Sequence, residues 1–174
     1  MMALPTDEHL LAASVRGDGD AFASLAARYG PELDAYFRRR LPDDGRVEEL
    51  RQETLLAVYS LLPSYRERGR FRSLLFSIAF RKLVSARRGE APAAPLPEEI
   101  AAPMPASDAF EVRAAVDRLP IPLREALFLT VFEGFRAAEA GAVLGCSAEA
   151  VRARVCRAKT LLAKFLNPGS RRTT

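Results

Sequence analysis

The stretch that decides the fold lies near the C-terminus, where residues 135–162 read FRAAEAGAVLGCSAEAVRARVCRAKTLL. Apolar positions three and four residues apart predict two helices, separated by Gly145, Cys146 and Ser147. Glycine ends helices in the left-handed conformation, and a serine hydroxyl caps the helix that follows. The stretch therefore predicts a helix-turn-helix, whose second helix can enter the major groove of DNA.

The outward face of the second helix carries small and charged side chains. With Val151 at the centre of the buried face, the opposite face holds Glu149, Ala150, Ala153 and Cys156. Its flanks hold Arg152, Arg157 and Lys159. Small side chains would let the helix approach base edges, and arginines can bond to bases or phosphates. The alternative is an ordinary helical hairpin with a solvated basic face.

The composition excludes several classes of protein. The chain has 174 residues, 49% of them hydrophobic, which suits one domain or two small ones. No apolar run is long enough to span a membrane. Residues 1–11 carry Asp7 and Glu8 and no basic residue, so they do not resemble a secretory signal. Two cysteines exclude a disulfide framework, and one histidine excludes most metal sites and histidine catalysis. We expect a protein that is no enzyme, needs no cofactor and does not insert into a membrane.

The positive charge is concentrated in two segments. The net charge is only +4, but residues 64–88 hold eight basic residues against Glu67 alone. Residues 150–174 hold seven basic residues and no acidic one. Arginine, which forms bidentate contacts with phosphates and guanine, makes up most of this charge. Two basic segments suggest two contacts with one polyanion.

Helical periodicity predicts an all-α protein. In the first half, Thr6 can cap a helix that ends near Gly17, and a second helix follows Asp18, with Pro31 bending or dividing it. A helix ended by Pro63 then carries an apolar stripe of Val47, Leu50, Thr54, Val58 and Leu61. The last helix of this half spans residues 71–89.

A proline-rich linker divides the chain. Residues 91–107 contain five of the twelve prolines and show no helical or strand period. This predicts a first domain at 1–90, a flexible linker at 91–107 and a second domain at 108–167. In the second domain Ser107 caps a helix that carries Val112 on its apolar face. The next helix ends at Gly134 and has an apolar face of Leu123, Leu127, Val131 and Phe132.

The motifs of both halves resemble one family. The sequences REAL at 124–127, EGF at 133–135, LGCS at 144–147 and VRAR at 151–154 resemble the promoter-binding domain of extracytoplasmic-function (ECF) sigma factors of the sigma-70 family. In the first half, VEELRQET at 47–54 and FRSLLFSIAFRKLV at 71–84 resemble the other domain of that family, in the same order. The resemblance covers nearly the whole chain.

The resemblance implies that the second domain binds the minus 35 element of a promoter as a duplex. The positions that this assigns to DNA are Ser147, Glu149, Ala150, Arg152, Ala153, Arg154, Arg157 and Lys159. Arg154 lies nearer the buried face than the others, so for this residue a phosphate contact or a structural pair is as good an alternative as base reading.

The first domain would melt and hold the minus 10 element. Flipped bases need aromatic faces or pockets, and the freed strand needs cations. The candidates are Tyr65, Arg66, Arg68, Arg70, Arg72, Phe76, Phe80, Arg81, Lys82 and Arg88. Phe71 lies on the core stripe, whereas Phe76 and Phe80 lie off it. The family usually has Trp, Asn and Asp where this chain has Leu74, Arg81 and Ser85. Either the promoter sequence therefore differs from the family's usual one, or melting is weak without help.

The resemblance also implies protein partners. The helix that ends at Pro63 begins with an acidic segment, residues 43–53. By resemblance it would dock on the clamp coiled coil of the β′ subunit of core RNA polymerase through Glu49, Leu50, Gln52, Glu53 and Thr54. The alternative is a solvated helix face. An anti-sigma factor would control the protein, which would be cytoplasmic or held at the membrane by that factor. Two other functions stay open: a sigma-like decoy that titrates an anti-sigma factor, and a helix-turn-helix regulator that works without polymerase.

Overall fold

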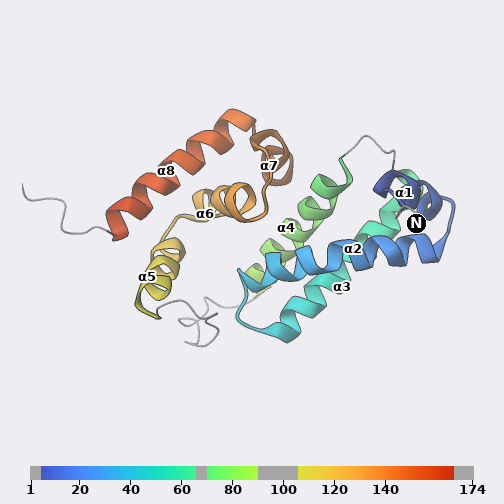
Figure 1. Ribbon diagram of the computed structural model, residues 1–174, viewed down its shortest axis with the longest axis horizontal. Coiled ribbons are helices and arrows are strands. Elements are labelled where there is room, and N and C mark those ends of the chain that lie inside the picture. Colours follow the sequence, from blue (N-terminus) through green and yellow to red (C-terminus); the bar gives the residue numbers. More distant parts are fainter. Residues whose placement is uncertain (1–4, 66–69, 90–105, 167–174) are drawn as a thin grey trace, which may run out of the picture. The chain divides into compact units, whose positions relative to one another are not determined.

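The structure is a computed structural model that describes residues 5–65, 70–89 and 106–166 (Figure 1). In these residues all regular secondary structure is helical, which confirms the all-α prediction. The chain divides into two compact units, Met1–Leu96 and Pro97–Thr174. The proposed linker lies almost entirely outside the described residues. None of the described helices is both long enough and apolar enough to cross a membrane.

The described residues of the N-terminal unit form four α-helices and one short turn. They are α1 (Asp7–Val15), α2 (Gly19–Arg38), α3 (Asp44–Leu61), the 3₁₀ turn η1 (Leu62–Ser64) and α4 (Phe71–Gly89). In sequence order, α2 packs on α1, α3 on α2 and α4 on α3. Side-chain oxygens of Thr6, Asp18 and Asp43 accept backbone N–H groups at the starts of α1, α2 and α3, which confirms the Thr6 cap. Pro31 does not divide α2.

Aromatic residues fill the centre of this unit. The ring of Tyr36 lies edge-on to Phe37 and Phe76, with centroids 5.2 and 5.3 Å apart, and all three side chains are inaccessible to solvent. Burying one large apolar side chain is worth about 1.5–3 kcal/mol, so this cluster stabilises α2 against α4. Leu61, expected on the buried stripe of α3, is instead 45% exposed at the end of that helix.

The C-terminal unit places its helices against the last one. It contains α5 (Ala106–Asp117), α6 (Ile121–Leu127), the π-helical turn η2 (Phe128–Phe132), α7 (Ala137–Leu144) and α8 (Ala148–Leu166). Helix α8 packs on α5, α6 and α7. Leu119, Leu127 and Ala158 are the buried centre of one core cluster, which Leu123, Val155 and Phe165 extend.

Three expectations for this unit are wrong. Val131 and Phe132 are 54% and 50% exposed instead of lying on the buried face. The cause is η2, where the Glu133 N–H bonds to the Phe128 carbonyl 3.1 Å away, five residues back, so the wider turn rotates these side chains outward. Val112 is 46% exposed on α5. Helix α5 starts at Ala106, so Ser107 lies inside its first turn.

Candidate nucleic-acid interface

The turn between α7 and α8 has the geometry that the sequence predicts. Gly145 ends α7 with φ +65° and ψ +37°, the left-handed conformation. The Ser147 hydroxyl accepts the Ala150 N–H at 3.2 Å and caps α8. A Cβ atom on Gly141 would lie 2.5 Å from the Cys146 carbonyl oxygen, so the turn packs directly on the backbone of α7. These contacts set the direction in which α8 leaves the turn.

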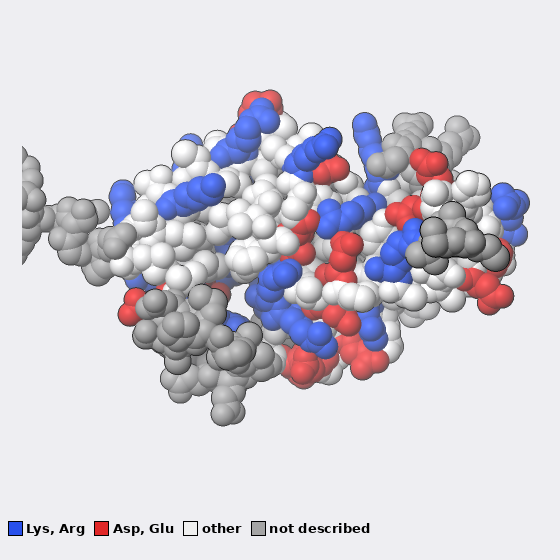
Figure 2. Space-filling view, viewed as in Figure 1, with Lys and Arg blue, Asp and Glu red and all other residues white. Residues whose placement is uncertain are grey.

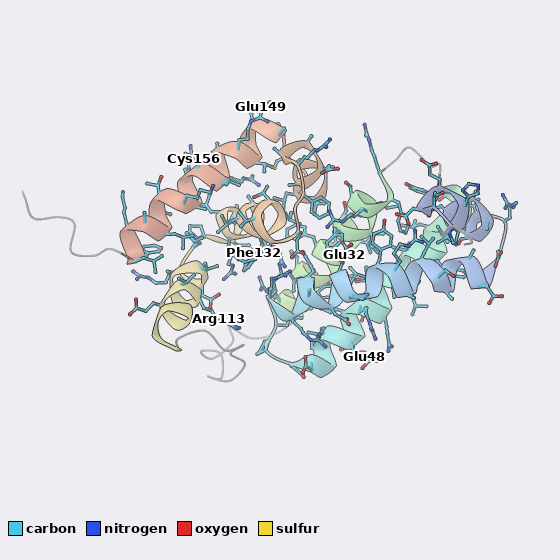
Figure 3. All side chains as sticks on the ribbon, viewed as in Figure 1. Glu32, Glu48, Arg113, Phe132, Glu149 and Cys156 are labelled. Carbon is cyan, nitrogen blue, oxygen red and sulfur yellow. The ribbon has the colours of Figure 1, made fainter. Side chains whose placement is uncertain are left out.

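Helix α8 buries one face and exposes a basic one. Val151 and Ala158 are fully buried, whereas Glu149, Arg152, Ala153, Arg157 and Lys159 are exposed. Ala150 is half-buried, and Cys156 is exposed further along the helix (Figure 3). In Figure 2 the visible side of α8 carries Lys and Arg along its length and an acidic group at its N-terminal end. This face has the small and cationic side chains that a DNA-reading helix needs.

Arg154 makes a contact inside the motif. Its side chain is half-buried, and Nη1 lies 3.3 Å from Cys146 Sγ. The guanidinium therefore braces the turn from the first half of α8, which matches the structural alternative. The sequence indicated the partial burial of Arg154 but gave no sign of its partner.

Glu149 and Arg152 form an ion pair on the exposed tip of α8. Arg152 Nη2 lies 2.7 Å from Glu149 Oε1, and the side chains are 62% and 76% exposed. The pKa of Glu149 is lowered, chiefly by a hydrogen bond from its own backbone N–H, then by the Ser147 hydroxyl and the positive charge of Arg152. Glu149 is therefore anionic at neutral pH and sits at the positive end of the helix dipole.

The basic side chains of α4 are partly neutralised by the unit itself. Arg72 Nε lies 2.9 Å from Glu32 Oε2, and Lys82 Nζ lies 3.0 Å from Glu53 Oε2. Sequence reasoning missed both pairs, because their members lie on different helices. Arg70 and Arg81 are exposed. Arg66 and Arg68 lie outside the described residues, as does the side chain of Arg88.

Phe76 is not available to a DNA base, so that prediction is wrong. Its side chain is 0% exposed and packs against Tyr36 of α2. Helix α4 is covered on more than one side, so its buried surface is wider than the stripe read from the sequence. Phe71 is buried as expected, with its ring edge-on to Tyr29 and Tyr65. The remaining aromatic candidates, Tyr65 and Phe80, are half-buried.

The docking candidates on α3 fall into two groups. Leu50 and Thr54 are buried at 1% and 0% exposure, and the Thr54 hydroxyl donates to the Leu50 carbonyl at 2.6 Å, so they cannot touch a partner directly. Glu49 and Gln52 are exposed and Glu53 is half-exposed. Gln52 Nε2 donates to Glu48 Oε1 at 3.1 Å, and Glu49 pairs with Arg46.

An apolar surface continues from Gln52 along α3. Leu56 and Tyr59, one and two turns further on, are 67% and 45% exposed. The Tyr59 ring packs on Phe22 of α2, with centroids 4.9 Å apart. Sequence reasoning missed this surface, although the four-residue step from Gln52 to Leu56 was a signal for it. In the described residues no group of three His, Cys, Asp or Glu side chains could hold a metal ion.

Two family models match the two units. Sigma-70 region 2 matches residues 25–92, and Sigma-70, region 4 matches residues 109–162. The chain is 36% identical over 172 residues to the ECF RNA polymerase sigma factor ShbA of Streptomyces griseus, covering 86% of this chain and 89% of ShbA. It is 31% identical over 166 residues to the ECF RNA polymerase sigma factor SigD of Mycobacterium tuberculosis, covering 86% of this chain and 78% of SigD.

A solved structure of a sigma factor has a similar fold. CnrH, in complex with the cytosolic domain of CnrY, superposes with a TM-score of 0.73 at 27% identity, covering 94% of this chain and 98% of CnrH. The fold and motifs define the sigma-70 class of transcription-initiation factors, which are not enzymes. Within that class, the chain belongs to the ECF RNA polymerase sigma factor family.

Proposed function

We propose that the chain is an alternative sigma factor that binds core RNA polymerase, recognises a promoter, melts it and starts transcription. The observation that carries this proposal is the helix-turn-helix of the C-terminal unit. Its turn is fixed by Gly145 and Ser147, and α8 presents an exposed face of small and cationic side chains. The N-terminal unit supports it with a second basic face on α4 and an acidic helix α3.

In this proposal α8 reads the minus 35 element in the major groove. Arg152 and Arg157 reach base edges or phosphates, Lys159 reaches phosphate, and Ala150 and Ala153 allow close approach. Ser147 fixes the start of the helix and Arg154 its turn. This division of roles rests on which side chains are exposed and which are held by the motif itself.

Helix α4 and the segment before it would hold the minus 10 element. Arg70 and Arg81 are exposed cations, and Phe80 and Tyr65 are partly accessible rings on which an unstacked base can lie. Leu74, where the family usually has Trp, is half-buried. Arg72 and Lys82 are engaged by Glu32 and Glu53 and would have to leave these partners to contact phosphate.

The exposed part of α3 would bind core RNA polymerase at the β′ clamp coiled coil. Gln52, Glu49 and Leu56 offer polar, anionic and apolar contacts on one side of the helix, while Leu50 and Thr54 hold the helix in place. A cytoplasmic location follows from this partner. An anti-sigma factor is the proposed regulator, because the similar protein CnrH is bound to the cytosolic domain of CnrY.

Binding of core RNA polymerase tests the docking part directly. The full chain, labelled with a fluorophore, is titrated with core enzyme and the binding is followed by anisotropy. Gln52→Ala should weaken binding about tenfold, because a central polar contact at an interface is lost. The matched control is Glu8→Ala, which changes an exposed side chain on α1. Equal affinity of wild type, Gln52→Ala and control would refute docking through α3.

This titration, together with measurements of DNA binding, separates the alternative functions. A decoy would bind an anti-sigma factor and show no affinity for core polymerase. A regulator that works without polymerase would bind a specific duplex alone and gain no affinity for DNA from the core enzyme. A sigma factor binds the core enzyme, and promoter thymines should then become reactive to permanganate where the strands separate.

A further inference from the structure

Helix α1 carries none of the residues proposed to bind DNA or polymerase, yet polar contacts tie its first turn to α2. The Asp7 carboxylate accepts hydrogen bonds from the Arg28 guanidinium and from the Tyr29 hydroxyl. Arg28 Nη2 also donates to the Pro5 carbonyl at 2.7 Å, just before α1 begins. The helix packs on α2 and contacts the turn η1 (Figure 1). These contacts fix the start of α1 within the N-terminal unit.

Tyr29 connects Asp7 with the interior of the unit. Tyr29 is only 7% exposed, and its ring lies edge-on to that of Phe71, with centroids 5.4 Å apart. A buried hydroxyl that loses its hydrogen-bond partner is costly. Without Asp7, the Tyr29 hydroxyl would have to turn towards water for a new partner, and the ring would turn with it. Asp7 thus holds the ring in the position against which Phe71 packs.

Phe71 passes this support on to Tyr65, one of the minus 10 candidates. Phe71 is the first residue of α4 and is 5% exposed. Its ring lies edge-on to that of Tyr65, with centroids 6.1 Å apart. The Tyr65 backbone N–H bonds to the Leu62 carbonyl at 3.0 Å, so η1 holds its main chain. The half-buried Tyr65 side chain rests on Phe71, and a base can stack on the part that remains accessible.

The start of α4 is held by α2 at two successive residues. Glu32, labelled in Figure 3, lies one turn after Tyr29 and pairs with Arg72, the residue after Phe71, at 2.9 Å. Tyr29 and Glu32 therefore fix the position of α4 relative to α2 at the end where Tyr65 lies. Edge-on ring pairs have a preferred geometry, so a displaced Tyr29 ring would disturb Phe71 and then Tyr65.

We propose that Asp7 is a positioning residue for promoter melting, which acts on Tyr65 through Tyr29 and Phe71. The Asp7 carboxylate holds the Tyr29 ring, Tyr29 supports Phe71, and Phe71 presents the Tyr65 ring to an unstacked base of the minus 10 strand. Helix α1 is therefore a working part of the minus 10 surface. This inference rests on the proposed function, because it needs Tyr65 to bind a base.

The first measurement is the binding of single-stranded DNA by the holoenzyme of core RNA polymerase and the full chain. The probe is short DNA of random sequence, enriched by one round of selection with the wild-type holoenzyme. Asp7→Ala should weaken binding of this probe about fivefold, because one base loses a well-placed ring on which to stack. Its affinity for core polymerase should stay unchanged. Glu8→Ala, which changes an exposed side chain of the same turn, is the matched control.

A second substitution shows whether the effect passes through Tyr29. Tyr29→Phe removes the hydroxyl that needs a partner and keeps the ring. In the double variant with Asp7→Ala, binding of the probe should return to within about twofold of the wild type, because removing both members of a buried hydrogen bond is nearly neutral. If Asp7 only anchored α1 through Arg28, the double variant would bind as poorly as Asp7→Ala, which would overturn the proposed route.

The second measurement follows residue 65 in the free protein. The chain contains no Trp, so Tyr65→Trp places a single fluorophore there. Added Asp7→Ala should make acrylamide quench this fluorescence more strongly, because the ring loses its support. Phe37→Leu, which removes buried volume elsewhere in α2, is the stability control. It should lower the melting temperature and leave quenching unchanged. Unchanged quenching with Asp7→Ala would contradict the inference.

The binding measurement separates failure of the inference from failure of the proposed function. If the wild-type holoenzyme binds the probe and Asp7→Ala binds it equally well, Asp7 does not position Tyr65, although the proposed function stands. If Phe37→Leu weakens binding as much as Asp7→Ala, loss of stability explains the effect and the inference is wrong. If the wild-type holoenzyme binds no single-stranded DNA, the proposed minus 10 contact and the inference fail together.

Discussion

Lys82 of α4 places its ammonium nitrogen 3.0 Å from a carboxylate oxygen of Glu53 on α3. The sequence assigned these two residues to different surfaces, Lys82 to the DNA and Glu53 to the polymerase. Their ion pair joins the two helices at the boundary between those surfaces. The two side chains are 36% and 40% exposed, so the pair is partly screened by solvent.

The first prediction concerns the strength of this pair. A double-mutant cycle of Glu53→Gln and Lys82→Met, followed by urea unfolding, should give a coupling of about 0.2–1 kcal/mol. The control is the pair of Arg38 and Asp44, which is 61% and 70% exposed and should give less coupling. A coupling for Glu53 and Lys82 that is no larger than that of the control would show that the contact does not hold the helices together.

The second prediction separates two phenylalanines of α4. Phe76→Ala should destabilise the fold by about 3–5 kcal/mol, because it leaves a cavity beside Tyr36 and Phe37. Phe80 is half-buried, so Phe80→Ala should cost clearly less stability and instead reduce promoter opening. Urea unfolding and permanganate reactivity measure the two effects. Similar losses of stability for both variants would contradict the burial described for Phe76.

The third prediction concerns the turn before α8. Gly141→Ala should destabilise the helix-turn-helix by about 1–3 kcal/mol, because the new Cβ would overlap the Cys146 carbonyl at 2.5 Å. Gly19→Ala is the control, since no atom lies within 4 Å of a Cβ placed there. The control should be neutral or slightly stabilising. Thermal unfolding of the full chain measures both, and an unchanged Gly141→Ala protein would mean that the turn is not closely packed.

The fourth prediction is a pH dependence at Tyr29. The pKa of Tyr29 is raised, mainly by burial, then by its hydrogen bond to Asp7 and the negative charges of Asp7 and Glu32, while Arg72 lowers it. Above about pH 10 the unfolded chain releases this proton and the native state keeps it, so stability falls as pH rises through that range. Below about pH 10 both states are protonated and the contribution is fully present.

Replacing Tyr29 should therefore reduce the loss of folding stability at alkaline pH. The free energy of unfolding of Tyr29→Phe should fall less than that of the wild type between about pH 8 and about pH 10.5. Tyr59→Phe, which changes a 45% exposed ring, is the control and should fall as much as the wild type. Parallel declines of wild type and Tyr29→Phe would contradict the effect of burial and Asp7 on Tyr29.

Local signals in the sequence were enough to predict several helix ends and the buried face of α8. The Thr6 cap, the left-handed Gly145, the Ser147 cap and the burial of Val151 all follow from neighbours within a few residues. Such signals are readable because the physical cause lies within one turn of the chain.

The wrong expectations depend on partners far away in the sequence or on a change of helix type. Phe76 is buried because Tyr36, forty residues earlier, covers it. Val131 and Phe132 point outward because η2 is a π-helical turn, and the predicted helix assumed a constant period. Lys82 meets Glu53 only when α3 and α4 pack together. Periodicity defines one face of a helix and leaves its neighbours undetermined.

Run-off transcription with core RNA polymerase is the most direct test of the proposed function. The full chain and the core enzyme are incubated with a pool of bacterial promoter fragments and nucleotides. We expect transcripts from a subset of promoters that appear only when the protein is present, and that decrease with Gln52→Ala or Arg152→Ala. Absence of protein-dependent transcripts from every promoter, together with no binding of the wild type to core polymerase, would contradict the assignment as a sigma factor.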